Sequence, residues 1–138
     1  MFSSLFSNNL DKCTLTNTPV FKIPEKIKKC KIVKVIDGDT VKVAMKPFLF
    51  APYYIFNVRL LGVDADEIRT KDLEEKKQGY KIKKYLENLL TKNNKYYVYI
   101  RCDKFDNFGR ILGELYFDKN KLNNINILVS DYIRKLNT

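Results

Sequence analysis

The chain has 138 residues, which is enough for one domain around a single hydrophobic core, and its formal net charge is +10. It contains no histidine, which excludes histidine-based metal sites, Ser-His-Asp catalysis and imidazole acid–base chemistry. Its three cysteines have no Cys-x-x-Cys spacing, which excludes a zinc site of soft ligands and favours free thiols in a reducing compartment.

The excess of positive charge predicts a polyanionic partner, either nucleic acid or an acidic membrane face. A basic composition from AT-rich coding is the alternative, because Lys, Asn, Ile, Tyr and Phe are all heavily used. The N-terminus lacks the pattern of a secretory signal, and no segment approaches the roughly 20 apolar residues of a membrane span. We therefore expect an intracellular, cytoplasmic monomer without a membrane partner.

Residues 1–25 are polar and contain two prolines, which predicts an irregular N-terminal arm. Val20, Phe21 and Ile23 are the apolar side chains of this arm that would dock on a sheet. The folded domain is expected to occupy residues 26–138.

Two strands are predicted over residues 31–36 and 41–45, because apolar residues recur in both and alternate with period two in the second. Asp37-Gly38 between them is a hairpin-turn signal, since glycine tolerates positive φ. Residues 46–53 contain two prolines and form a hydrophobic loop. Residues 55–64 then predict a third strand.

The next segment, 66–75, is charged and has no apolar period, so we expect a loop. A helix is predicted from Lys76 to the stop signal Asn93-Asn94. Its apolar face would carry Tyr80, Ile82, Tyr85, Leu86, Leu89 and Leu90.

Alternation returns over residues 95–102, which predicts a fourth strand. A turn containing Gly109 leads to a fifth strand over 111–117, and residues 125–136 predict a short closing helix. Five strands with a helix after the third indicate an α+β, mostly β, fold: a small barrel of the oligonucleotide-binding (OB) type.

The sequence RLLGVDADE, Arg59 to Glu67, places three carboxylates within four positions: Asp64, Asp66 and Glu67. Carboxylates this close repel one another, and a divalent cation between them would keep them ionised. The alternative is a solvated acidic loop. Asp39, where the second strand starts, would face this segment, although Asp37-Gly38-Asp39 can also be read as a turn and nothing more. Oxygen ligands alone suit Ca²⁺ or Mg²⁺.

Arg59 and Arg110 are the two arginines that we assign to this candidate site. Such side chains are bidentate donors that hold a phosphate and neutralise charge developing on it. The alternative is that both are ordinary surface arginines of a basic chain.

The motifs IDGDT, RLLGVDADE, a Lys-rich helix and DNFGR follow one another in an order that resembles the staphylococcal nuclease-like (thermonuclease) family. The resemblance runs from about Lys31 to Leu136. It implies the five-stranded barrel described above and cleavage of DNA and RNA with Ca²⁺, Mg²⁺ being the less favoured ion. The chain resembles the small intracellular or viral members of this family more than the secreted ones, so we expect a viral or microbial origin.

The resemblance also assigns roles to individual residues. Asp39 and Asp64 match the metal-binding aspartates, and Ala65 stands where the family supplies a backbone carbonyl to the metal. Glu67 matches the general base or organiser of the attacking water, and Arg59 and Arg110 match the phosphate-contacting arginines. The sequence thus predicts that the three acidic side chains meet around one ion, flanked by two guanidinium groups.

Two departures from the family pattern stand out. Asp64-Ala65-Asp66-Glu67 replaces the usual Asp-Thr-Pro-Glu, which leaves a main-chain carbonyl but changes the loop. The sequence ends at Thr138, so we expect it to lack the family's last helix.

Several lysines, with Lys71, Lys83 and Lys84 as the chosen candidates, would guide a single strand of nucleic acid to the site. Tyr53, Tyr54, Phe105 and Phe108 are candidates for base stacking, but packing in the core or in loops is the favoured interpretation. The predicted function is a Ca²⁺-dependent nuclease of low sequence specificity acting on DNA or RNA, single strands preferred. The alternative is a non-catalytic nucleic-acid-binding module.

Overall fold

The computed structural model describes residues 9–91, 97–120 and 123–138. Its five strands close into a barrel in the order β1-β2-β3-β5-β4, with one helix between β3 and β4 and another after β5. This confirms the predicted OB-type barrel. The elements are β1 (Lys28–Asp37), β2 (Thr40–Met45), β3 (Tyr54–Leu60), α2 (Leu73–Thr91), β4 (Tyr97–Phe105), β5 (Ile111–Tyr116) and α3 (Ile125–Leu136).

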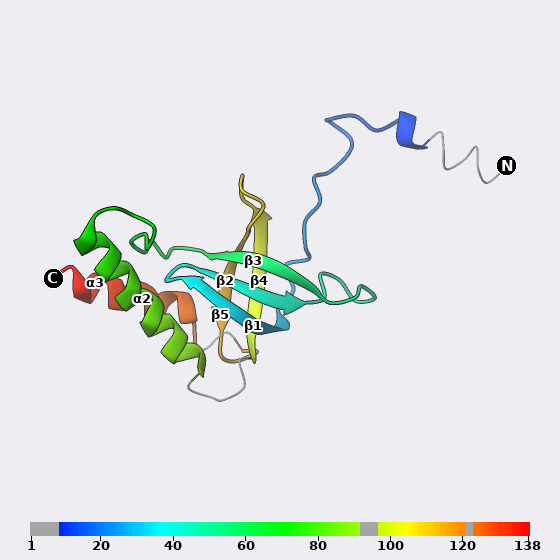
Figure 1. Ribbon diagram of the computed structural model, residues 1–138. Coiled ribbons are helices and arrows are strands. Elements are labelled where there is room, and N and C mark those ends of the chain that lie inside the picture. Colours follow the sequence, from blue (N-terminus) through cyan, green and yellow to red (C-terminus); the bar gives the residue numbers. More distant parts are fainter. Residues whose placement is uncertain (1–8, 92–96, 121–122) are drawn as a thin grey trace.

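Helices α2 and α3 lie at one end of the barrel, and the loop between β2 and β3 projects from the opposite end (Figure 1). The N-terminal arm leaves the barrel and extends away from it. Ile23 of this arm is buried in the core, and the Phe21 ring lies 6.2 Å from that of Phe105, whereas Val20 is exposed. Two of the three predicted docking residues therefore reach the domain. The proposed boundary at residue 26 stays a prediction.

Strand pairing brings one turn and two strand ends together at the helix-covered end of the barrel. The β1–β2 hairpin pairs Asp37 with Thr40, and β2 pairs antiparallel with β3 so that Thr40 lies opposite Arg59. β3 then pairs in parallel with β5, with Arg59 beside Leu112. The β1–β2 turn, the end of β3 and the start of β5 are consequently neighbours.

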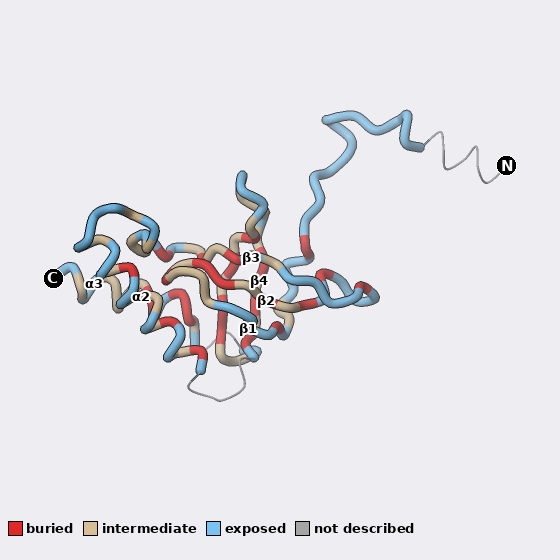
Figure 2. Tube along the Cα trace, in the orientation of Figure 1, coloured by how far each residue is buried: buried red, intermediate tan, exposed pale blue. Residues whose placement is uncertain are grey.

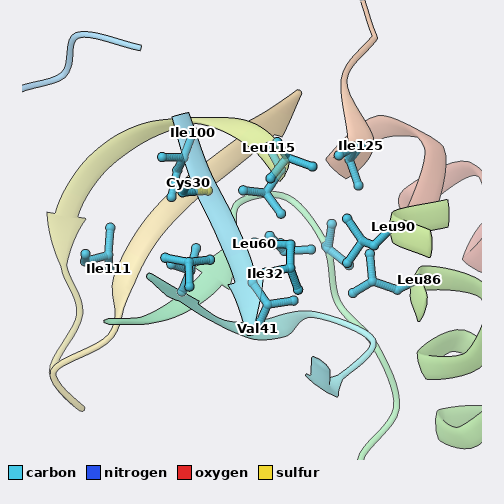
Figure 3. Close-up of a cluster of buried hydrophobic side chains, with 14 of the residues drawn as sticks. Cys30, Ile32, Val41, Leu60, Leu86, Leu90, Ile100, Ile111, Leu115 and Ile125 are labelled. Atoms are coloured by element: carbon cyan, nitrogen blue, oxygen red, sulfur yellow. The ribbon is translucent and has the colours of Figure 1, made fainter. Parts of the chain in front are cut away.

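The core fills the barrel and continues under both helices (Figures 2 and 3). Alternate residues of each strand point inward, as in β4, where Val98, Ile100 and Cys102 are buried. Cys30 and Cys102 are free thiols within this core, as predicted. Burial raises the pKa of Cys30 to about 12 and that of Cys102 to about 11, so both thiols stay protonated.

The third strand is shorter than predicted, because β3 ends at Leu60. Gly62 adopts a φ of +75°, and the Val63 amide donates to the Leu60 carbonyl at 3.3 Å, which turns the chain away from the sheet. Val63 is buried after this turn. Asp64 is therefore on a loop and does not directly follow a strand.

Helix α2 begins earlier than predicted, at Leu73. Asp72 caps it, since its Oδ1 accepts from the Glu74 and Glu75 amides at 3.0 and 3.3 Å. The predicted apolar face is correct at Ile82, Leu86 and Leu90, but Tyr80 is exposed. The stop signal Asn93-Asn94 lies outside the described residues.

Gly38 is required for a different reason from the predicted positive φ, which the described glycines show at positions 62 and 109. A Cβ atom at Gly38 would lie 2.2 Å from Ile82 Cγ2. The hairpin turn thus packs directly against α2. No helix among the described residues has the length and apolar character needed to cross a membrane.

Candidate functional site

Asp39 joins the β1–β2 turn to the segment that follows β3. Its backbone carbonyl accepts from the Leu60 amide at 2.8 Å, and its carboxylate Oδ2 accepts from the Ala65 amide at 3.3 Å. Thr40 Oγ1 donates to the other carboxylate oxygen at 2.9 Å. Residues 26 positions apart in the sequence are in this way held side by side.

Arg59 stabilises the same junction. Its Nη1 donates to the Leu60 carbonyl at 2.8 Å and also to the Val63 carbonyl. Its Nη2 lies 3.6 Å from Asp39 Oδ2, and both side chains are largely buried. An arginine has five N–H donors, so Nε and part of Nη2 are left for a further acceptor.

Arg110 is fixed by the tight turn before β5. Gly109 adopts a φ of +79°, and Asp106 accepts at 2.9 Å from the Arg110 amide and at 2.8 Å from Arg110 Nε. The guanidinium also lies 5.4 Å from the centre of the Phe108 ring. These contacts occupy Nε, while Arg110 lines the hollows on both sides of it.

The carboxylate of Asp106 is kept ionised by this pairing. Burial by itself would raise its pKa, but hydrogen bonds from the Arg110 backbone and side chain and from the Phe108 amide lower the pKa below its ordinary value. Arg110 is thus held by a partner that carries a full negative charge.

Two adjoining hollows share Arg110. The first is lined by Arg59, Asp64, Asp106 and Arg110, and the second by Asp37, Thr40, Glu67, Arg69 and Arg110. Asp64 and Glu67 are both exposed side chains of the loop after β3. The five side chains predicted for the site, Asp39, Arg59, Asp64, Glu67 and Arg110, therefore lie at one end of the barrel around these hollows.

Asp37, which we did not predict as a site residue, lines the same hollow as Glu67 and Arg110. Its pKa is raised, first by burial and then by the charge of Asp39, while Lys83, Arg69 and Arg110 oppose the shift. Asp37 therefore lies close to Asp39, to Arg110 and to a lysine of α2. The signal was present, since two aspartates flank one glycine in IDGDT, but we interpreted Asp37 as a turn residue alone.

The three candidate lysines occupy different positions. Lys83, on α2, is partly buried and lies near Asp37. Lys84 is exposed on the same helix, and Lys71 is exposed in the loop before it. Tyr53, Tyr54 and Phe108 are exposed and lie outside the core, but each ring contacts a neighbouring side chain: Lys46, Phe56 and Arg110, respectively. A role of these aromatics in base stacking stays a prediction. Phe105 does pack against the core.

The residues predicted to bind a metal ion fit that role only in part. Asp39, Asp64 and the Ala65 carbonyl are oxygen donors, which suits a hard cation that completes its shell with water. Within residues 9–91, 97–120 and 123–138, however, no group of three or more acidic or cysteine side chains is arranged to hold an ion. Because Asp64 and Glu67 line different hollows, the expected meeting of three carboxylates around one ion is wrong.

Comparison with known protein families matches residues 57–130 to a model described as staphylococcal nuclease homologue. This segment is more than half of the chain and runs from β3 into α3, so it includes Arg59, Asp64, Glu67 and Arg110. Asp39 lies before the matched segment. No curated protein matches the chain.

Proposed function

The chain belongs to the family of staphylococcal nuclease homologues, and on that basis we propose that it is a nuclease. The proposed reaction is Ca²⁺-dependent hydrolysis of phosphodiester bonds in DNA or RNA, with little sequence specificity and a preference for single strands. The family is typically nucleolytic, and barrels of this type generally bind nucleic acids. We place this activity inside the cell, in a monomer.

The observation that supports the proposal is the position of Arg110. It lines one hollow with Arg59 and Asp64 and the adjoining hollow with Glu67. A phosphate between the two arginines would therefore have an acidic side chain on each side. Pure nucleic-acid binding gains nothing from carboxylates in that position, because they repel phosphate.

The chain's own groups divide the work of hydrolysis. Arg59 and Arg110 bind the non-bridging phosphate oxygens and stabilise the charge that grows on them. Glu67 accepts a proton from the attacking water, whose oxygen forms a bond to phosphorus as the bond to the leaving sugar oxygen breaks, and the leaving oxygen takes up a proton from solvent water. Asp39, Asp64 and the Ala65 carbonyl would hold Ca²⁺, which when bound supplies further positive charge at the phosphate.

Substitution of Glu67 and Arg110 tests these roles. We expect Glu67→Gln to lower kcat roughly 10²–10⁴-fold, because the proton acceptor is lost. Arg110→Ala should lower it roughly 10²–10³-fold, because one donor to the phosphate is removed. The assay is cleavage of denatured DNA with Ca²⁺ by purified protein.

Two exposed residues of the same types serve as controls: Glu74→Gln in the first turn of α2, and Arg134→Ala in α3. Both controls should cleave as the wild type does. Wild-type turnover in Glu67→Gln or Arg110→Ala would contradict the assignment.

Removal of the metal is a separate test. A chelator in excess should stop cleavage, and added Ca²⁺ should restore it, whereas Mg²⁺ should restore less. Full cleavage in the chelator would show that the reaction needs no divalent cation.

A non-catalytic binding module is the second candidate. The charge of +10 and the lack of a three-carboxylate group among the described residues favour it. It predicts salt-sensitive binding of single-stranded DNA without turnover at any Ca²⁺ concentration. Binding without cleavage in the wild type would establish this alternative.

A further inference from the structure

The loop between β2 and β3 exposes three consecutive apolar side chains, which we call the apolar tip: Phe48, Leu49 and Phe50. Their exposed fractions are 51, 77 and 93%. Isolated apolar residues on a surface are ordinary, but three in succession at the end of a projecting loop indicate a binding surface.

The stem of this loop is held in place. Pro47 and Ala51, on either side of the tip, are buried. Lys28 Nζ donates to the Pro47 carbonyl at 2.8 Å, and the Ala51 amide donates to the Phe48 carbonyl at 3.1 Å. The tip is therefore presented by a fixed turn, so that ordering it on a partner costs little entropy.

A groove beside the tip is surrounded by positive charge. Its lining includes four lysines, which we call the lysine collar: Lys26, Lys28, Lys29 and Lys46. Residues 24–29 and 46–53 contain one acidic side chain, Glu25, whose carboxylate lies 3.3 Å from Lys22 Nζ. An acidic surface therefore complements this end of the molecule.

The tip is remote from the nuclease site. β2 begins directly after Asp39 and ends directly before Lys46, so its length separates the two, roughly 20 Å at about 3.3 Å per residue. Figure 1 shows the loop projecting from the end of the barrel opposite the helices. A partner on the tip leaves the hollows around Arg110 open.

We propose that the apolar tip and the lysine collar together bind the surface of an anionic lipid bilayer. The tip enters the boundary between headgroups and acyl chains, while the lysines contact acidic headgroups. The three side chains of the tip carry no hydrogen-bonding group with which to contact a base edge or a phosphate, which favours lipid over nucleic acid. The expectation of no membrane partner came from the lack of a membrane span, and peripheral binding needs none.

A tryptophan reporter tests the proposal directly, because the chain contains no tryptophan. Phe50→Trp is mixed with vesicles of phosphatidylcholine and phosphatidylserine, or of phosphatidylcholine alone. We expect its emission to shift to the blue with the anionic vesicles and not with the neutral ones. Tyr80→Trp, at an exposed position of α2, should not shift with either.

Sedimentation with the same anionic vesicles measures the contribution of the tip. The variant Phe48→Ser, Leu49→Ser, Phe50→Ser should lose at least about tenfold in affinity, since its apolar contact is removed. Ile127→Ser, at an exposed apolar position of α3, should bind as the wild type does. If the triple variant does not fold, as judged by circular dichroism, Leu49→Asp takes its place with the same expectation.

Three results would overturn the proposal. The first is that the wild type fails to sediment with anionic vesicles. The second is that the folded tip variant binds these vesicles as tightly as the wild type. The third is that the emission of Phe50→Trp responds to denatured DNA and not to vesicles. None of these depends on catalysis, so a protein without nuclease activity can still bind the bilayer.

Discussion

At the scale of single residues, the pairing of Asp106 with Arg110 decides where the positive charge of the site lies. Asp106 accepts hydrogen bonds from both the amide and Nε of Arg110, which holds the Nε edge of the guanidinium in place. The aspartate acts on the reaction through the arginine and is a positioning residue.

We predict that Asp106→Asn lowers kcat for DNA cleavage about tenfold, because Arg110 is no longer held by a charged partner. Asp131→Asn, which breaks the exposed pair of Asp131 with Arg134, is the matched control. The measurement is kcat and KM for each variant. A change in thermal stability without any change in kcat would show that Asp106 is structural only.

Glu114 provides a prediction on pH. Its pKa is held below the ordinary value, first by the hydrogen bond from the Tyr116 hydroxyl and then, against the effect of burial, by Arg101, whose Nη2 lies 2.6 Å from its carboxylate. A carboxyl group whose pKa is lower in the folded state stabilises the fold above its ordinary pKa. This contribution is lost as the pH falls through the folded-state pKa.

Glu114→Gln should therefore lower the free energy of unfolding by about 1–2 kcal/mol near neutral pH. At a pH below the lowered folded-state pKa of Glu114 the difference from the wild type should become small, because Glu114 is then protonated in the folded protein as well. Urea unfolding at both pH values measures this, with the exposed Glu87→Gln as control. An equal loss at both pH values would assign the effect to packing.

At the scale of elements, the contact between the β1–β2 turn and α2 aligns the site. Asp37 and Asp39 lie on either side of Gly38, and a Cβ at Gly38 would overlap Ile82 of the helix. The absence of a side chain at this position lets the helix approach the turn that carries both aspartates.

Gly38→Ala should destabilise the protein by about 1–3 kcal/mol, because the new methyl group displaces Ile82. The cost should be smaller in the Ile82→Ala background, where Cγ2 is absent. A double-mutant cycle from urea unfolding measures the coupling. Equal costs in both backgrounds would show that the clash is relieved elsewhere.

At the scale of the whole molecule, the charge of +10 predicts the salt dependence of substrate binding. Each phosphate contact to a single strand contributes about −0.7 to the slope of log K against log salt. Lys83→Gln should reduce the slope by about that amount, since Lys83 lies beside the site. Lys135→Gln, at an exposed position of α3, should leave it unchanged.

This prediction is measured by fluorescence anisotropy with labelled single-stranded DNA over a series of salt concentrations, with Ca²⁺ omitted to prevent cleavage. If Lys83→Gln and Lys135→Gln change the slope alike, the binding is a property of overall charge and not of the site.

The sequence by itself determined the order of the elements, because alternation and helical periodicity are local properties of the chain. It also determined α3, whose bounds match the prediction, and Arg59 and Arg110 as neighbours of the acidic loop. Motifs far apart in the chain pointed to one site because their order matched a known family.

Only the tertiary structure decided the features that depend on contacts between distant segments. The turn at Gly62 ends β3 early and moves Asp64 onto a loop, so that Asp64 and Glu67 face different hollows on either side of Arg110. The role of Gly38 and the place of Asp37 in the site follow from the approach of α2 to the first hairpin. Periodicity cannot reveal these features, because they are set by which surfaces meet when the barrel closes.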